Sequence, residues 1–275
     1  MAKIVAWNIA RRDDAWRRLR ECDADIALLQ EASPPPPDIA PEFDIDPAPW
    51  RTDGAGLNRA WRTAVVRLSD RVAVQYLEAK PIADAHRGDL AVSRPGTLAA
   101  AIVTPLTGEP FVVASLYAPW EAPHRTAARS SWIYADASAH RVISDLSVLI
   151  GQQGGHRILA AGDLNILHGY GENGSNYWAG RYATVFDRMA ALGMSFVGPQ
   201  TPDGRAADPW PQELPRTSRN LPTYHTSHQT PATATRQLDF VFASTGLAQR
   251  THVSALNAPD QWGPSDHCRL QIDVA

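Results

Sequence analysis

The sequence predicts an α/β fold in which mixed β-sheets form one domain over residues 1–275. Three observations predict it. Short apolar runs typical of buried strands recur along the chain, amphipathic helical patterns separate some of them, and alternating runs close in sequence indicate hairpins. No internal repeat or interdomain linker interrupts this pattern. A chain of 275 residues can bury a full hydrophobic core without disulfides or a structural metal.

The N-terminal part predicts a strand, a helix and a second strand. Residues 3–8 are short and apolar, as in a buried strand, and residues 13–22 have a helical pattern that begins with two acidic residues. Acidic side chains suit a helix start because they interact favourably with its dipole. Residues 25–31 form the second buried strand. The proline run at 34–37 ends it, since proline fits neither a helix interior nor a central strand.

Two hairpins and the longest helix are predicted next. Alternating apolar runs between residues 61 and 77 indicate one hairpin. Residues 98–104 and 111–117 indicate the other, joined by a segment with two prolines and a glycine. Residues 126–149 carry the longest helical pattern, and the glycines within 151–155 end it.

The C-terminal part alternates strands with one helix and one long loop. Residues 157–163 are typical of a buried strand, and residues 181–192 of an amphipathic helix. Residues 199–222 contain six prolines, so we expect an ordered loop rather than a domain boundary. The last strands are predicted at 236–243, 253–256 and 269–274.

Composition excludes several classes of function. With 44% apolar residues, the chain has the composition of a folded protein and not of a disordered one. Its net charge of −3 excludes a strongly basic surface for nucleic acid but does not exclude a local basic groove. Two cysteines form no disulfide framework. No apolar run approaches the roughly 20 residues of a membrane helix, and the N-terminus lacks the features of a signal peptide. We therefore expect a cytoplasmic location and no membrane partner.

Polar residues follow the predicted strands where the chain leaves a sheet. They are Asn8, Gln30, Glu31, Tyr117, Asp163 and Asn165, with Asp239 inside a strand and Ser265-Asp266-His267 before the last one. Strand ends around a crevice are the usual place for sites in α/β folds. Asn and Asp after a strand are most often turn residues, so a single one of them is weak evidence.

Taken in order, these residues form a pattern that covers nearly the whole chain. Gly162-Asp163-Leu164-Asn165 and Ser265-Asp266-His267 are its most specific motifs, and Gln30-Glu31 accompanies them. The pattern resembles the endonuclease/exonuclease/phosphatase superfamily, the fold of DNase I, exonuclease III and neutral sphingomyelinases. That resemblance implies a DNase I-like four-layer sandwich, with two mixed β-sheets packed face to face and helices outside.

The resemblance also implies hydrolysis of a phosphate ester with a divalent metal, usually Mg²⁺ or Mn²⁺. A phosphodiester is anionic, so its hydrolysis needs a hard cation on the phosphate oxygens, a base near the water and stabilisation of the leaving oxygen. The implied metal-binding residues are Asn8, Glu31 and Asp266. Glu31 could instead cap a turn before the prolines, and Asn8 could be a turn residue.

The implied catalytic residues are Asp163, Asn165, His267, Asp239 and Tyr117. Asp163 would position or deprotonate the water, and Asn165 would donate its amide to a phosphate oxygen. His267 would bind the phosphate or act as a general acid or base, its ring held by Asp239. Tyr117 would contact the phosphate or help to stabilise the leaving group. Alternatively, Asp163 and Asn165 form an Asx turn, Asp239 is a structural carboxylate and Tyr117 is packing.

The chain departs from the repair branch of this superfamily. Exonuclease III-like repair enzymes carry an acidic residue two positions after the first Asn, where this chain has Ala10. The element around Tyr117 lacks both flanking Asn residues, and Cys268 replaces the proline common after Ser-Asp-His. Abasic-site repair is therefore not the favoured activity. Thr223-Tyr224 is similar to the superfamily's Thr-aromatic element, which we expect to support the site.

Substrate contacts are expected in the loops beside the site. The segment after Asn165 supplies candidates that could stack a base and bind a phosphate: His168, Tyr177, Trp178 and Arg181. They could equally belong to a glycine-rich loop that covers the core. Trp120 and Arg125 form a second candidate wall.

Three functions remain open at this point. The first is a metal-dependent nuclease acting on DNA or RNA. The second is a phosphohydrolase of a small or lipid phosphate ester, although the absence of a basic patch or an exposed amphipathic helix weakens the lipid version. The third is an inactive binding protein of the same fold. No protein partner can be inferred.

Overall fold

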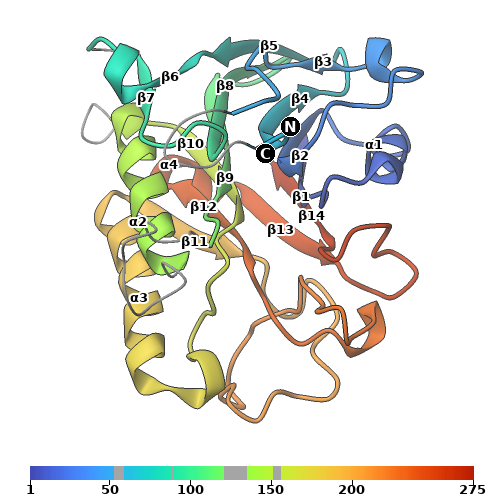
Figure 1. Cartoon of the computed structure of the whole chain (residues 1–275), viewed down its shortest axis with the longest axis vertical. Helices are drawn as coiled ribbons and strands as arrows, with labels where there is room; N and C mark the ends of the chain where they lie inside the picture. The colour runs from blue at the N-terminus through green and yellow to red at the C-terminus, as the bar shows by residue number, and fades with distance from the viewer. Residues whose placement is uncertain (53–58, 88, 121–134, 151–155) are drawn as a thin grey trace.

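The structure is a computed structural model that describes all residues except 53–58, 88, 121–134 and 151–155. Within the described residues, two six-stranded sheets pack face to face (Figure 1). The first sheet has the order β13 (Thr251–Leu256), β14 (Arg269–Val274), β1 (Ala2–Asn8), β2 (Ile26–Ala32), β4 (Arg62–Arg67), β3 (Asp44–Ile45). The second has the order β11 (Met194–Gly198), β12 (Asp239–Ser244), β10 (Ile158–Asp163), β9 (Phe111–Tyr117), β8 (Leu98–Pro105), β5 (Val72–Leu77).

Both sheets are mixed. In the first, β1 runs parallel to β2 and antiparallel to β14. In the second, β10 runs parallel to β9 and antiparallel to β12. Two short strands, β6 (Ala79–Pro81) and β7 (Leu90–Val92), pair separately. The predicted hairpin at 98–117 is confirmed, because β8 and β9 pair antiparallel.

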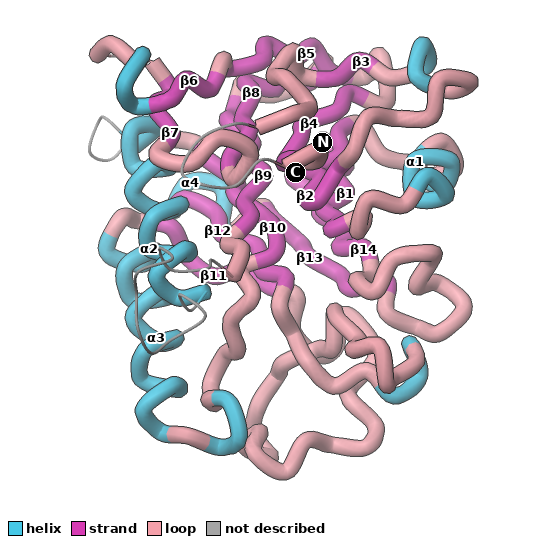
Figure 2. Tube along the Cα trace, viewed as in Figure 1, coloured by secondary structure: helices cyan, strands magenta, loops and turns pink. Residues whose placement is uncertain are grey.

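Helices lie on the outer faces of the two sheets, which completes four layers (Figure 2). Helix α1 (Asp13–Leu19) packs on the first sheet through Trp16 and Leu19. Helices α2 (Ala135–Leu146) and α3 (Asn176–Ala191) cover the second through residues such as Val142 and Val185. A short helix, α4 (Thr245–Ala248), follows β12. The predicted four-layer α/β sandwich is therefore confirmed. No described helix has the length and apolarity needed to cross a membrane.

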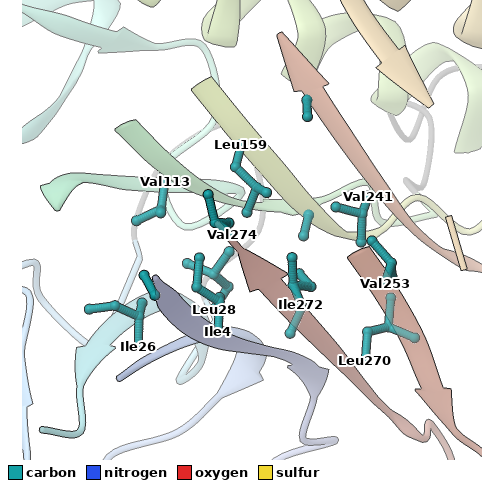
Figure 3. Close-up of a cluster of buried hydrophobic side chains, with 14 of the residues drawn as sticks. Ile4, Ile26, Leu28, Val113, Leu159, Val241, Val253, Leu270, Ile272 and Val274 are labelled. Atoms are coloured by element: carbon teal, nitrogen blue, oxygen red, sulfur yellow. The ribbon is translucent and has the colours of Figure 1, made fainter. Parts of the chain in front are cut away.

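Aliphatic side chains from both sheets fill the space between them (Figure 3). They come from alternate positions of the strands and include Ile4, Ile26, Leu28, Val113, Leu159, Val241, Leu270 and Ile272. Each fully buried side chain of this kind contributes roughly 1.5–3 kcal/mol relative to exposure. The alternate residues face outward, as Val5 and Ala27 do toward α1. This packing holds the two sheets in a fixed relation, on which the site depends.

Two details differ from the predictions. The strands predicted as a hairpin at 61–77 lie in different sheets, because β4 pairs with β2 and β5 pairs with β8. Alternation identifies a strand with one buried face but not its partner. Helix α3 begins at Asn176, ahead of the predicted 181, because the Ser175 side chain caps it by accepting a hydrogen bond from the backbone N–H of Trp178.

The remaining element predictions concern a helix and a loop. Helix α2 is described from Ala135, and the predicted stretch 126–134 before it lies outside the described residues. The proline-rich segment 199–222 contains neither helix nor strand, as predicted.

Candidate active site

The ends of several strands meet where the two sheets face each other. Register places Asn8 opposite Gln30 in the first sheet. In the second sheet it places Asp163 opposite both Tyr117 and Asp239. Polar side chains that lie far apart in sequence therefore share one edge of the sandwich, as parallel strand ends commonly do in α/β folds.

Asp163 lies at the centre of this edge and is 1% exposed. Asn8 Nδ2 donates a hydrogen bond to its Oδ2 at 3.0 Å, which links the first sheet to the second. Asn165 donates from its backbone N at 2.8 Å and from Nδ2 at 3.0 Å. Burial, and after it the charge of Asp239, raises the pKa of Asp163 to about 7, although the charge of His267 lowers it. The carboxylate is thus oriented by amide donors and titrates near neutrality.

His267 lies between two carboxylates. Its Nδ1 is 2.8 Å from Asp239 Oδ2, and its Nε2 is 3.8 Å from Asp163 Oδ2. Burial alone would lower the pKa of His267, but the charges of Asp239 and Asp163 outweigh burial and raise it to about 10. At neutral pH the ring is therefore an imidazolium that donates from Nδ1 to Asp239.

Two neighbouring groups hold this pair in place. Thr223 Oγ1 accepts a hydrogen bond from the backbone N of Asp239, and the Tyr224 ring lies 4.9 Å from the ring of His267. This agrees with the supporting role expected for Thr223-Tyr224. Trp7 Nε1 also donates to the His267 carbonyl oxygen at 2.9 Å.

Glu31 and Tyr117 form the other side of the site. The Tyr117 hydroxyl donates to Glu31 Oε1 at 2.7 Å, and Arg11 Nε lies 3.5 Å from Oε2. Burial, followed by the charges of Glu31 and Asp163, raises the pKa of Tyr117 well above its ordinary value, so the hydroxyl stays a donor.

Left-handed backbone conformations concentrate around these groups. Glu31 has φ +47°, at a bulge where the register between β2 and β4 shifts, and Asn165 has φ +51°. Ala10 and Arg11 have φ +47° and +60°. These conformations cost free energy in non-glycine residues, so they persist only where the surrounding structure imposes them. A bulge commonly changes the direction in which a side chain points. Here two of the strained residues have side chains that contact the site, Glu31 through Tyr117 and Asn165 through Asp163.

Gly162 is required by close approach of the backbones of β9 and β10. A Cβ at this position would lie 1.9 Å from the carbonyl oxygen of Leu116, and the residue has φ +155°. A larger residue would separate the strands that carry Tyr117 and Asp163. This explains the glycine of the Gly-Asp-Leu-Asn motif.

The charges of the site suit a hard cation. Within the described residues, Asp163, Asp239 and His267 have potential ligand atoms within 4.8 Å of one another, but an imidazolium cannot ligate a metal. The pKa of the Tyr224 hydroxyl is raised by burial and by the charges of Asp266, Asp163 and Glu31, whereas the charge of Arg236 lowers it. Carboxylates such as those of half-buried Glu31 and Asp266 are oxygen ligands of the kind Mg²⁺ and Mn²⁺ prefer.

Asn8 offers one further oxygen. Its Oδ1 accepts a hydrogen bond from the backbone N of Ala10 at 3.0 Å, which orients the amide nitrogen toward Asp163. A carbonyl oxygen has a second lone pair, so Oδ1 is still able to ligate a cation. Asn8, Glu31 and Asp266 thus offer oxygen donors of the type that a divalent ion prefers, and their role as its ligands stays a prediction.

The family model for the endonuclease/exonuclease/phosphatase family matches residues 5–267. The chain belongs to this family. Its fold is similar to the endonuclease domain of TRAS1, a telomere-specific non-LTR retrotransposon, with TM-score 0.62 and 13% identity over 100% of this chain and 98% of that one. It is also similar to the AP endonuclease LMAP from Leishmania major, with TM-score 0.61 and 14% identity over 99% and 87%. No curated protein matches the chain.

The structure gives the surroundings of several residues that were predicted to bind substrate. His168 packs against the rings of Phe186, Phe196 and Phe240, and its Nδ1 is 3.1 Å from Asn220 Oδ1. On α3, Arg181 pairs with Asp136 of α2 and contacts the rings of Tyr177 and Trp178. Trp120 is 37% exposed after β9, and Arg125 lies outside the described residues.

Sequence reasoning missed three residues beside the site of this family member. Arg11 contacts Glu31, and Trp61 lies edge-on to Tyr117 with ring centroids 5.2 Å apart. The Arg59 guanidinium lies 4.6 Å from the centroid of Trp61. No motif contains them. Their only sequence signal is proximity, since Arg11 follows Asn8 closely and Trp61 precedes the strand that pairs with β2.

Proposed function

We propose that the protein is a divalent-metal-dependent phosphodiester hydrolase that acts as a nuclease on DNA or RNA. The observation that carries this proposal is the buried arrangement of Asp163, His267 and Asp239, held by amide donors and facing the Tyr117–Glu31 pair. The family is one of phosphoric ester hydrolases, and both similar structures are named as endonucleases.

Asp163 is the general base in this proposal. A base works best when its pKa lies near the operating pH, and the pKa of this carboxyl is about 7. Asn8 and Asn165 donate to both of its oxygens, which orients the carboxylate toward an attacking water. The imidazolium beside Asp163 stabilises the ionised carboxylate and keeps its pKa from rising further, so the carboxylate is present at neutral pH to accept a proton.

His267 stabilises charge on the phosphate. Its Nδ1 is held by Asp239, so the Nε2–H is directed toward the space beside Asp163. There it donates to a non-bridging phosphate oxygen, where negative charge increases in the transition state. Asn165 has a second Nδ2–H that can donate to the phosphate at the same edge of the sheets, whereas the single Tyr117 O–H is used by Glu31.

Glu31, Asn8 and Asp266 would hold the metal. A bound Mg²⁺ or Mn²⁺ supplies a Lewis acid that neutralises phosphate charge. Tyr117 keeps Glu31 oriented through its hydroxyl, and the bulge at Glu31 fixes the backbone behind it.

Nicking of supercoiled plasmid in Mg²⁺ and in Mn²⁺, with EDTA as the control, tests this function. Single-stranded DNA and RNA oligonucleotides and a small phosphodiester run alongside. Asp163→Asn and His267→Gln should abolish cleavage. Asp145→Asn, a buried carboxyl on α2 whose pKa is also raised by burial, should retain it. Hydrolysis of the small ester alone, or cleavage that survives both site substitutions, would overturn the nuclease proposal.

A further inference from the structure

Arg11 is held beside the site by an unusual turn after β1. The backbone N of Ala10 donates to Asn8 Oδ1 at 3.0 Å, and the backbone N of Arg11 donates to the Glu31 carbonyl oxygen at 2.9 Å. Both Ala10 and Arg11 have left-handed φ. Two consecutive left-handed residues without glycine are costly, so the hydrogen bonds to Asn8 and Glu31 must impose the turn. The base of the Arg11 side chain is therefore fixed relative to the site.

The guanidinium of Arg11 is only partly engaged. Its Nε lies 3.5 Å from Glu31 Oε2, and the side chain is 59% exposed. In the part of the chain that the structure describes, Glu31 is its one ionic partner. The contact uses the Nε side, so the two Nη groups stay open to solvent and to a second anion. The planar guanidinium matches phosphate oxygens in a bidentate manner.

Arg11 and a metal ion would both interact with the Glu31 carboxylate. Its Oε1 accepts from Tyr117 and its Oε2 lies 3.5 Å from Arg11 Nε, so a cation bound to this carboxylate would lie close to the guanidinium. Like charges repel at this range, so the cation would weaken the contact of Arg11 with Glu31. Because the turn keeps Arg11 in place, the displaced guanidinium stays within reach of an anion at the metal.

We propose that Arg11 competes with the metal ion for Glu31 and binds a phosphate group of the substrate when the metal displaces it. This inference rests on the proposed function, since it takes the substrate to be a phosphodiester. It assigns to Arg11 two effects of opposite sign, one that weakens metal binding and one that strengthens substrate binding. A purely structural role would produce neither.

Mn²⁺ binding measured by electron paramagnetic resonance tests the first effect without substrate. Arg11→Gln should bind Mn²⁺ about three- to tenfold more tightly, the range expected for removing one partly exposed charge at this distance. Arg11→Lys keeps the charge and should stay near the wild-type affinity. Arg12→Gln, the exposed neighbouring arginine, is the matched control and should change the affinity little.

Binding of a fluorescein-labelled DNA duplex in Mn²⁺, followed by fluorescence anisotropy in an Asp163→Asn background that cannot cleave, tests the second effect. Arg11→Gln should weaken binding about tenfold, and Arg11→Lys should recover only part of it because lysine cannot bind bidentately. Circular dichroism confirms that each variant is folded.

Two results overturn the inference: unchanged Mn²⁺ affinity in Arg11→Gln, or equal effects of the Arg11 and Arg12 substitutions. Failure of the proposed function would be seen differently, as no cleavage by the wild type. The Mn²⁺ measurement needs no substrate, so it decides the competition at Glu31 in either case.

Discussion

Replacing Asp46 with alanine removes the partner of a buried guanidinium at the start of β4. Arg62 is 2% exposed and Asp46 is 6% exposed. Arg62 Nη1 donates to both carboxylate oxygens of Asp46, at 2.7 and 2.8 Å. The backbone N of Val65 donates to the same carboxylate at 2.8 Å. The substitution therefore leaves a buried cation without its counter-charge and a buried N–H without its acceptor, although Arg62 keeps its hydrogen bonds to the backbone carbonyl oxygens of residues 46 and 63.

The expected loss is large. Breaking a buried ion pair by removing one partner costs about 3–5 kcal/mol. The free energy of unfolding of a typical domain is only about 5–15 kcal/mol. At roughly 2–4 °C per kcal/mol for domains of 150–250 residues, a loss of about 4 kcal/mol lowers Tm by roughly 8–16 °C.

Urea unfolding, followed by tryptophan fluorescence and circular dichroism, measures this effect. Asp44→Ala is the matched control, because Asp44 lies two residues away and its pair with Arg67 is partly exposed. Its cost should stay below about 1 kcal/mol. The double variant Asp46→Leu with Arg62→Met should regain most of the loss, since an apolar pair of similar size tolerates burial. Equal costs for Asp46→Ala and Asp44→Ala, or no recovery in the double variant, would refute the reasoning.

Three further predictions concern the site and the acid stability. Asp239→Asn removes a charge that raises the pKa of His267, so NMR titration in EDTA should show that pKa falling from about 10. Nicking in Mg²⁺ should slow about 10²–10⁴-fold. An unchanged pKa of His267 would contradict the pairing of His267 with Asp239. Gly162→Ala places a Cβ against the carbonyl oxygen of Leu116, so we expect lower Tm in calorimetry together with lost nicking, and a wild-type Tm would disprove the clash. Burial alone would raise the pKa of Asp25, but hydrogen bonds to its carboxylate lower it. The stabilisation by Asp25 is therefore full above its ordinary pKa of 3.8 and is lost as the pH falls through its lower pKa in the folded state. Asp25→Asn should therefore make the free energy of unfolding, measured by urea titration at acid pH, depend less on pH. An unchanged pH dependence would exclude this role.

Most strands and the fold class could be predicted because fully buried strands leave short apolar runs and half-buried strands leave a period of two in the sequence. Partners could not be predicted in the same way. The stretches that became β4 and β5 alternate equally well, yet the chain crosses between the sheets at the turn that joins them. Alternation describes one strand, whereas pairing depends on residues far away in the chain.

Only those residues of the candidate site that belong to recognisable sequence motifs could be predicted. Asn8, Asp163 and His267 come together because strand ends converge, and polar residues at strand ends are visible in the sequence. Arg11 was not visible, because its position depends on two left-handed residues that no propensity favours. The substrate role of His168 stays a prediction; its ring lies among phenylalanines, which the glycine-rich composition of the neighbouring segment does not reveal.

The pairing of β1 with β14 has a consequence for the synthesis of the protein. Asn8 ends β1, whereas His267 lies two residues before the start of β14, the strand that lies beside β1 in the first sheet. Asn8 and His267 can therefore meet only after both segments have been synthesised. A nascent chain still short of residue 267 lacks the His267 imidazole, and β1 still has an open edge where β14 will pair. Under the proposed function, the candidate centre is incomplete in such a chain, so it should have no hydrolytic activity.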